Sequence, residues 1–192
     1  MITATDRLVD GVDLLVLDVQ GVLFNKPLEA FLYDVGERTG EGGQSLQHRW
    51  QRELRTPFWT GHLDEASMWK QLARSESPSA LRHELESRYE RGPLWTRANT
   101  FPGEVWLLSN HRSRWLHERI ARFGITDRFN RIVVSDDIGA VKPDPRAFCA
   151  VSEQCLTRSV LFVDDQIHNV EAARGLGIRA ALATADGTLQ GR

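Results

Sequence analysis

Lysine is scarce in this chain of 192 residues, which holds only Lys26, Lys70 and Lys142 among its 24 basic residues. We attribute the excess of arginine to genome composition, and it leaves few lysines to consider for an active-site role. Cysteine is also rare, since the chain has only Cys149 and Cys155. Their spacing matches no metal-binding pattern. We expect two reduced thiols in a cytoplasmic protein.

Long apolar runs and a strong charge of one sign are also missing. No apolar stretch approaches the roughly 20 residues that a membrane helix needs. Residues 1–10 have neither the basic start nor the apolar centre of a secretory signal. The net charge of −2 gives no electrostatic reason to expect nucleic acid or an anionic membrane as a partner. The length suits one full domain, or one domain with a modest insertion, and the oligomeric state stays open.

Short apolar runs that end in polar residues recur along the chain. Residues 14–17 run into Asp18, and residues 105–108 run into Ser109 and Asn110. Similar runs occupy residues 131–134, 160–163 and 180–182. Helical patterns separate these runs, so we predict an α/β fold with a doubly wound, parallel, five-stranded sheet. Such sheets bind ligands just beyond the carboxyl ends of their strands.

Residues 26–99 differ, because they carry helical spacing without a buried-strand pattern. We predict a core made of residues 1–25 and 100–192 with a helical domain inserted at 26–99. Within the insertion, Thr56-Pro57 is expected to end a helix. Residues 94–104 leave room for barely one helical turn. The tryptophans of this region suit either the core of a small domain or a substrate platform; they are Trp50, Trp59, Trp69 and Trp95.

The predicted strand ends gather groups that suit phosphoryl transfer; they are Asp18, Gln20, Ser109, Asn110, Lys142, Asp164 and Asp165. The three carboxylates could hold a hard cation such as Mg²⁺, and without one they would repel each other. Asp164 and Asp165 could instead form a turn or cap the next helix. Lys142 can neutralise a phosphoryl group, and a carboxylate such as Asp18 can form an aspartyl-phosphate.

These residues stand in four motifs that resemble those of the haloacid dehalogenase superfamily, whose members are mostly Mg²⁺-dependent phosphatases. The motifs are DVQGV at 18–22, SN at 109–110, KP at 142–143 and DD at 164–165. The resemblance spans about residues 13 to 183 and implies a Rossmann-like core with a small helical cap that closes over the substrate. Residues 59–65, WTGHLDE, resemble a turn of small-capped members similar to glucose-1-phosphate phosphatases.

The resemblance also implies roles for the individual residues. Asp18 would be the nucleophile, oriented by Lys142, and Ser109 would bind the transferring phosphoryl group. Asp165 would be the main carboxylate of the fourth motif, with Asp164 beside it. The implied metal ligands are Asp18, the backbone carbonyl of Gln20, Asp164 and Asp165. The implied phosphate-binding residues are Ser109, Asn110, Lys142 and Gln20.

Gln20 departs from the family pattern, because most of its phosphatases have an aspartate there that acts as general acid and base. An amide cannot deliver a proton, and that role is typically worth a factor of about 10²–10⁴. A subgroup that also lacks this aspartate is nevertheless described as phosphatases. Gln20 is therefore compatible with a good leaving group, with a donor elsewhere such as His62 or His111, or with an inactive protein.

Three functions remain open on the sequence. The first is a phosphatase of a small phosphorylated metabolite, using Asp18 and Mg²⁺. The second is a dehalogenase with Asp18 as carbon nucleophile; the acidic pair at 164–165 argues against it, because that reaction needs no metal and those enzymes lack the pair. The third is a non-catalytic protein that binds a phosphorylated ligand or a partner, with Gln20 as the mark of lost activity.

Overall fold

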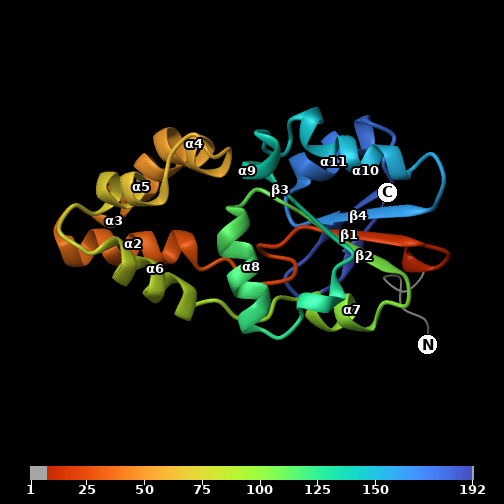
Figure 1. The fold of residues 1–192 in the computed structure, drawn as a ribbon, viewed down its shortest axis with the longest axis horizontal. Coiled ribbons are helices and arrows are strands. Elements are labelled where there is room, and N and C mark those ends of the chain that lie inside the picture. The colour runs from red at the N-terminus through yellow and green to blue at the C-terminus, as the bar shows by residue number, and fades with distance from the viewer. Residues whose placement is uncertain (1–7, 192) are drawn as a thin grey trace.

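The computed structural model describes residues 8–191, in which one sheet has the strand order β3-β2-β1-β4-β5-β6 (Figure 1). The strands are β1 (Leu14–Leu17), β2 (Glu104–Ser109), β3 (Arg131–Val134), β4 (Val160–Asp164), β5 (Ala180–Ala183) and β6 (Leu189–Gln190). The predicted α/β fold is confirmed, with the five predicted strands all parallel. The two-residue β6 is an addition, antiparallel to β5. Residues 1–7, which make up most of the segment judged for a secretory signal, lie outside the described residues.

The central strand β1 is buried on both faces, as its uninterrupted apolar run predicts. Leu14 and Val16 pack in one core cluster and Leu15 and Leu17 in the other, because side chains alternate across a sheet. In the register, Leu17 lies opposite Leu107 of β2 and Val163 of β4. The chain therefore leaves all three strands at the same edge of the sheet.

Helices cover both faces of the sheet (Figure 1). One face carries α10 (Cys149–Gln154) and α11 (Ile167–Gly175), preceded in the chain by the short α9 (Ser135–Ile138) and the 3-10 turn η3 (Pro145–Phe148). The opposite face carries α7 (Trp95–Thr100) and α8 (Ser113–Arg122), followed by the 3-10 turn η2 (Thr126–Arg128). The segment 94–104 thus holds a six-residue helix, more than the single turn that its length suggested.

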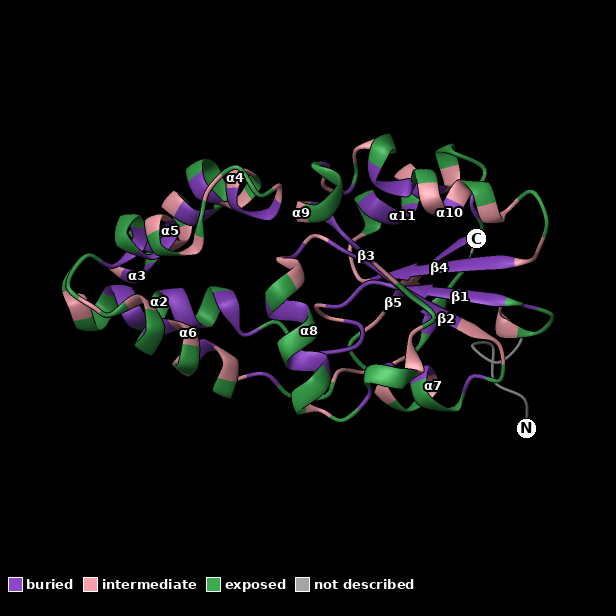
Figure 2. Cartoon of the chain, in the orientation of Figure 1, coloured by how far each residue is buried: buried purple, intermediate pink, exposed green. Residues whose placement is uncertain are grey.

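A second group of helices lies beyond the carboxyl edge of the sheet, at the left of Figure 1. It comprises α2 (Leu28–Thr39), α3 (Gly43–Arg49), the π-helical turn η1 (Trp50–Leu54), α4 (Arg55–Trp59), α5 (Glu65–Leu72) and α6 (Pro78–Ser87). Figure 2 shows their buried sides turned toward one another. Trp50, Trp59 and Trp69 are at most 4% exposed and belong to this core. They pack edge-on or stacked against neighbouring rings, including Trp115 of α8.

The expected helix end at Thr56-Pro57 is wrong. The helical chain continues from α3 through η1 into α4, and Pro57 is the third residue of α4. Proline has no N–H to donate, so a regular α-helix would lose a hydrogen bond at this point. The π-helical turn just before Pro57 changes the local hydrogen-bond pattern, and such turns recur at functional sites. Among residues 8–191, no helix has both the length and the apolar character needed to cross a membrane.

Candidate active site

The strands β1, β2 and β4 end at one edge of the sheet (Figure 1), and several of the predicted functional residues stand at these ends. Asp18 follows β1 directly, Ser109 is the last residue of β2, and Asp164 is the last residue of β4. Lys142 enters from the loop after α9. All four are at most 5% exposed, which is rare for charged side chains unless they are paired.

Lys142 connects the two aspartates. Its Nζ donates hydrogen bonds to Asp18 Oδ1 at 2.8 Å, to Asp164 Oδ2 at 2.6 Å and to the backbone oxygen of Leu108 at 2.8 Å. An ammonium group has three protons to donate, so all three are used and its position is fixed. The Oδ2 atom of Asp18 is left out of these bonds, and Asp18 lines a cavity.

The charges of this group shift one another's ionisation. Burial raises the pKa of Asp18 to about 7, against the opposing effect of Lys142, and Asp164 and Asp165 raise it further. Burial alone would lower the pKa of Lys142, but Asp164 and Asp18 outweigh it and the pKa is raised. The lysine therefore stays charged, and added positive charge near Asp18 would favour its ionised, nucleophilic form.

The carboxylates fit a divalent cation. Ligand atoms of Asp18, Asp164 and Asp165 lie within 4.8 Å of one another. Asp164 is already satisfied, because its Oδ1 accepts from the backbone of Gln166 at 2.8 Å and Asn169 donates to both of its oxygens. Asp165 differs: its Oδ1 is buried without a hydrogen-bond partner in the described part of the chain. An orphaned buried oxygen beside two further carboxylates is what an oxygen-liganded metal such as Mg²⁺ needs.

Ser109 and Asn110 occupy different positions in the site. Both line the cavity. The Asn110 carboxamide forms a reciprocal pair with the backbone of Lys142, with Nδ2 donating to the carbonyl at 2.9 Å and Oδ1 accepting from the N–H at 2.7 Å. The side chain of Asn110 thus braces the loop that carries Lys142. The phosphate-binding roles of both residues stay predictions.

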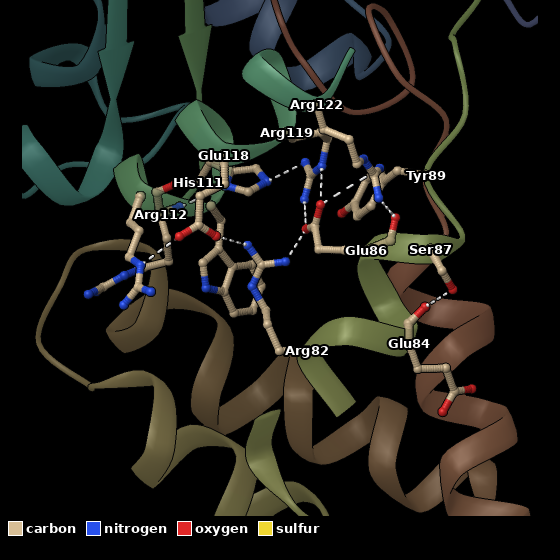
Figure 3. Close-up of polar contacts among 12 residues, drawn as sticks. Arg82, Glu84, Glu86, Ser87, Tyr89, His111, Arg112, Glu118, Arg119 and Arg122 are labelled. Atoms are coloured by element: carbon tan, nitrogen blue, oxygen red, sulfur yellow. Dashed lines mark hydrogen bonds and ion pairs between the residues drawn. The ribbon is translucent and has the colours of Figure 1, made fainter. Parts of the chain in front are cut away.

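Gln20 is tied to a distant part of the chain. Its Nε2 donates to the phenol oxygen of Tyr89 at 2.8 Å, across 69 positions of sequence. The guanidinium of Arg119 lies over the Tyr89 ring, 3.3 Å from its centroid, and Arg119 also pairs with Glu86 (Figure 3). His111 completes this buried cluster, with Nε2 2.9 Å from Nη1 of Arg119. Nothing in the sequence pattern pointed to this connection.

Neither histidine considered as a substitute proton donor lines the cavity. His111 is fully buried, and its Nε2 accepts from Arg119, since arginine can only donate. Burial, reinforced by the charge of Arg119, holds the pKa of His111 well below its usual value. His62 is exposed and pairs with Thr60. The geometry therefore supports neither His62 nor His111 as the proton donor.

A cavity of about 400 Å³ opens between the sheet edge and the inserted helices. The rest of its lining includes Lys26, Trp50 and Trp59, which the sequence had singled out, and four residues that it had not, which are Leu28, Glu29, Gln51 and Arg55. Gln51 links two of them, donating to Glu29 at 2.6 Å and accepting from Arg55 at 3.0 Å. Glu29 of α2, Gln51 of η1 and Arg55 of α4 thus form a polar row in the lining that also holds Trp50 and Trp59.

Solved structures share this architecture. An enzyme of the haloacid dehalogenase family from Bacteroides thetaiotaomicron, in complex with magnesium and inorganic phosphate, has a TM-score of 0.72 at 21% identity, covering 91% of this chain and 96% of that one. L-2-haloacid dehalogenase from Xanthobacter autotrophicus has a TM-score of 0.64 at 22% identity, covering 90% and 77%. Residues 104–183 match the sequence family described as haloacid dehalogenase-like hydrolase. The fold is that of the haloacid dehalogenase-like hydrolases.

Curated relatives of this chain include enzymes with different names. Phosphoglycolate phosphatase of Cereibacter sphaeroides is 31% identical over 130 residues, covering 58% of this chain and 59% of the relative. Drimenol cyclase of Aspergillus calidoustus is 28% identical over 182 residues, covering 88% of this chain and 33% of the relative. The matches thus span from a third to about three fifths of the length of these relatives.

Proposed function

We propose that this chain is a Mg²⁺-dependent phosphatase that hydrolyses a small phosphorylated metabolite through an aspartyl-phosphate on Asp18. The observation that carries the proposal is the binding of Lys142 to Asp18 Oδ1, which leaves the other carboxylate oxygen for a substrate in the cavity. The orphaned Oδ1 of Asp165 supports the metal. The likeness to phosphoglycolate phosphatase supports a phosphate monoester as substrate.

The reaction would proceed in two steps. Asp18 Oδ2 attacks the phosphorus atom, the bond to the ester oxygen breaks, and the alkoxide leaves with that electron pair. Water then attacks the acyl phosphate, releasing inorganic phosphate and restoring the carboxylate. Lys142 holds Asp18 in place, and Asp164 holds Lys142. A divalent cation held by Asp18, Asp165 and the carbonyl of Gln20 would supply positive charge to the phosphoryl group.

The polar row of the cavity supports a small polar substrate. Glu29, Gln51 and Arg55 offer hydrogen-bonding groups in the lining that also holds Trp50 and Trp59, and the volume suits a small molecule. In this proposal the helices α2 to α6 of the predicted insertion at 26–99 form a small cap, similar to that of glucose-1-phosphate phosphatases, over the core predicted at 1–25 and 100–192. Helix α7, which spans the predicted boundary at residue 99, lies on the sheet with the core. The free thiols of the chain suit a cytoplasmic setting.

Two other functions each have one observation in their favour. The fold likeness to L-2-haloacid dehalogenase favours attack of Asp18 on carbon, but that reaction gives no use to the orphaned oxygen of Asp165. Binding of a phosphorylated ligand without turnover is favoured by Gln20, which cannot protonate a leaving alkoxide. The ordered contacts of Asp18, Lys142 and Asp164 favour a catalytic site over simple binding, and the orphaned oxygen of Asp165 favours the phosphatase over the dehalogenase.

The proposal is tested with a panel of phosphate monoesters and added Mg²⁺, comparing the wild type with Asp18→Asn. We expect the wild type to release phosphate from at least one monoester, and Asp18→Asn to release none. Chloride release from a haloacid without metal would instead establish the dehalogenase. Tight binding of inorganic phosphate without turnover on any ester would establish the binding protein.

A further inference from the structure

Lys26 has no role in the mechanism above, yet its ammonium group forms an ion pair with Asp165 Oδ2. Lys26 lies in the loop between β1 and α2 and lines the cavity. Its side chain is 47% exposed, whereas that of Asp165 is 10% exposed. A half-exposed cation therefore rests on a nearly buried carboxylate of the candidate metal site.

The loop is shaped to permit this pair. Gly21 has a φ of +83°, and a β-carbon added there would collide with Asp165 Oδ2 and with Lys26 Cε. A side chain at position 21 would thus push the two charged groups apart. Glycine serves here both for its backbone conformation and for the close approach of Lys26 to Asp165.

The scarcity of lysine gives a second, independent reason to single out Lys26. Only three lysines occur among 24 basic residues, and two of them, Lys26 and Lys142, line the same cavity. The third, Lys70, is exposed on α5. Lysine carries a compact charge on a flexible stem and moves easily, whereas arginine tends to stay locked in a planar pair.

The local charge explains what Lys26 does. With Asp18, Asp164 and Asp165 ionised, the three negative charges and the single positive charge of Lys142 leave a net charge of −2. Either the Lys26 ammonium or a divalent cation reduces this excess. Lys26 pairs with Oδ2 of Asp165, whereas the oxygen without a partner is Oδ1 of the same carboxylate. A metal on that carboxylate would lie close to the Lys26 ammonium, and the repulsion between the two positive charges would make each weaken the binding of the other.

We propose that Lys26 is a displaceable internal counter-ion, which holds Asp165 when no metal is bound and competes with a divalent cation for that carboxylate. This inference rests on the proposed metal-dependent function and adds a control of metal affinity within the same site. Lys26 is a positioning residue, since it acts on the reaction only through Asp165.

The test is titration calorimetry of the purified protein with Mg²⁺, comparing wild type, Lys26→Met and Lys70→Met. Methionine keeps the length of the stem and removes the charge. We expect Lys26→Met to bind Mg²⁺ about tenfold more tightly than wild type, because one repulsive charge near the ion is gone. Lys70→Met should bind like wild type. Asp165→Asn should abolish binding in the Lys26→Met background.

Thermal unfolding without metal gives a second readout that turnover does not affect. Lys26→Met should unfold at a lower temperature than Lys70→Met in metal-free buffer, and Mg²⁺ should reverse that order, since bound ligand stabilises the folded state. Equal or weaker Mg²⁺ binding by Lys26→Met, or no binding at all, would overturn the inference. Because no ester is used, these results are separate from success or failure of the phosphatase panel.

Discussion

The carboxamide of Gln20 donates a hydrogen bond to the phenol oxygen of Tyr89, with 2.8 Å between the two atoms. Tyr89 is nearly buried, and Arg119 lies against its ring. Gln20 is therefore fixed by the junction between α6 and the core. We infer that Gln20 positions groups in the site and that the leaving group departs without its help as an acid.

Replacing Gln20 by aspartate restores a group that can donate a proton. For an alkyl phosphate, whose leaving alkoxide is strongly basic, we expect Gln20→Asp to raise kcat by a factor approaching about 10²–10⁴. For 4-nitrophenyl phosphate, whose leaving group needs no proton, the change should be small. Gln20→Asn serves as the control, because it shortens the side chain and keeps the amide. An equal gain in kcat on both esters would show that the aspartate at position 20 does not act by donating a proton to the leaving group.

Glu86 is expected to be a large contributor to stability. It pairs with Arg119, whose side chain is fully buried, and its loss would leave that guanidinium without a carboxylate partner (Figure 3). We expect Glu86→Gln to lower the free energy of unfolding by about 3–5 kcal/mol. The control is Glu84→Gln on the same helix, because Glu84 makes more exposed ion pairs, each worth about 0–1 kcal/mol. Urea denaturation measures the free energy of unfolding of both variants. Equal losses in the two variants would contradict a larger contribution of Glu86 to stability.

His111 should make the protein sensitive to mild acid. Burial and Arg119 hold its pKa well below the usual value in the folded state, whereas the unfolded chain titrates near about 6.5. Below that pH the unfolded state binds a proton that the folded state does not. Stability from this group is therefore present above about pH 6.5 and falls by up to about 1.4 kcal/mol per pH unit below it.

The measurement is denaturation of wild type and His111→Asn on both sides of that pH. His111→Asn should lose less stability on acidification than wild type, even if it is less stable at neutral pH. His83→Gln is the control, because His83 is exposed on α6, and it should follow the wild type. Parallel profiles of stability against pH for wild type and His111→Asn would show that His111 does not cause the loss of stability in acid.

The sequence was sufficient to place the residues of the site that stand at the ends of strands. The apolar runs ending at Asp18, Ser109 and Asp164 identify parallel strands, and parallel strands bring their carboxyl ends to one edge. The same argument places Asn110, which follows β2 and lines the cavity. It does not place Lys142, which lies in a loop and was recognised only by the resemblance of its motif, nor the bonds between the Asn110 carboxamide and the backbone of Lys142.

The remaining features depend on contacts between distant segments, which no local pattern encodes. The Gln20–Tyr89 bond joins residues 69 positions apart, and the polar row of Glu29, Gln51 and Arg55 forms only when α2 packs beside η1. The helix end predicted at Thr56-Pro57 was wrong because the spacing of apolar residues does not reveal a π-helical turn. Lys26 was the exception, since the rarity of lysine was a usable signal.

The central claim is a phosphoryl group carried by Asp18. It is tested by mixing the enzyme with Mg²⁺ and 4-nitrophenyl phosphate, quenching in acid within the first turnovers, and analysing the peptides by mass spectrometry. We predict a phosphorylated peptide containing Asp18, with the phosphoryl group removed by hydroxylamine as expected for an acyl phosphate, and no modification in Asp18→Asn. Phosphate release that continues unchanged in Asp18→Asn, or turnover with the phosphoryl group on another residue, would contradict the account.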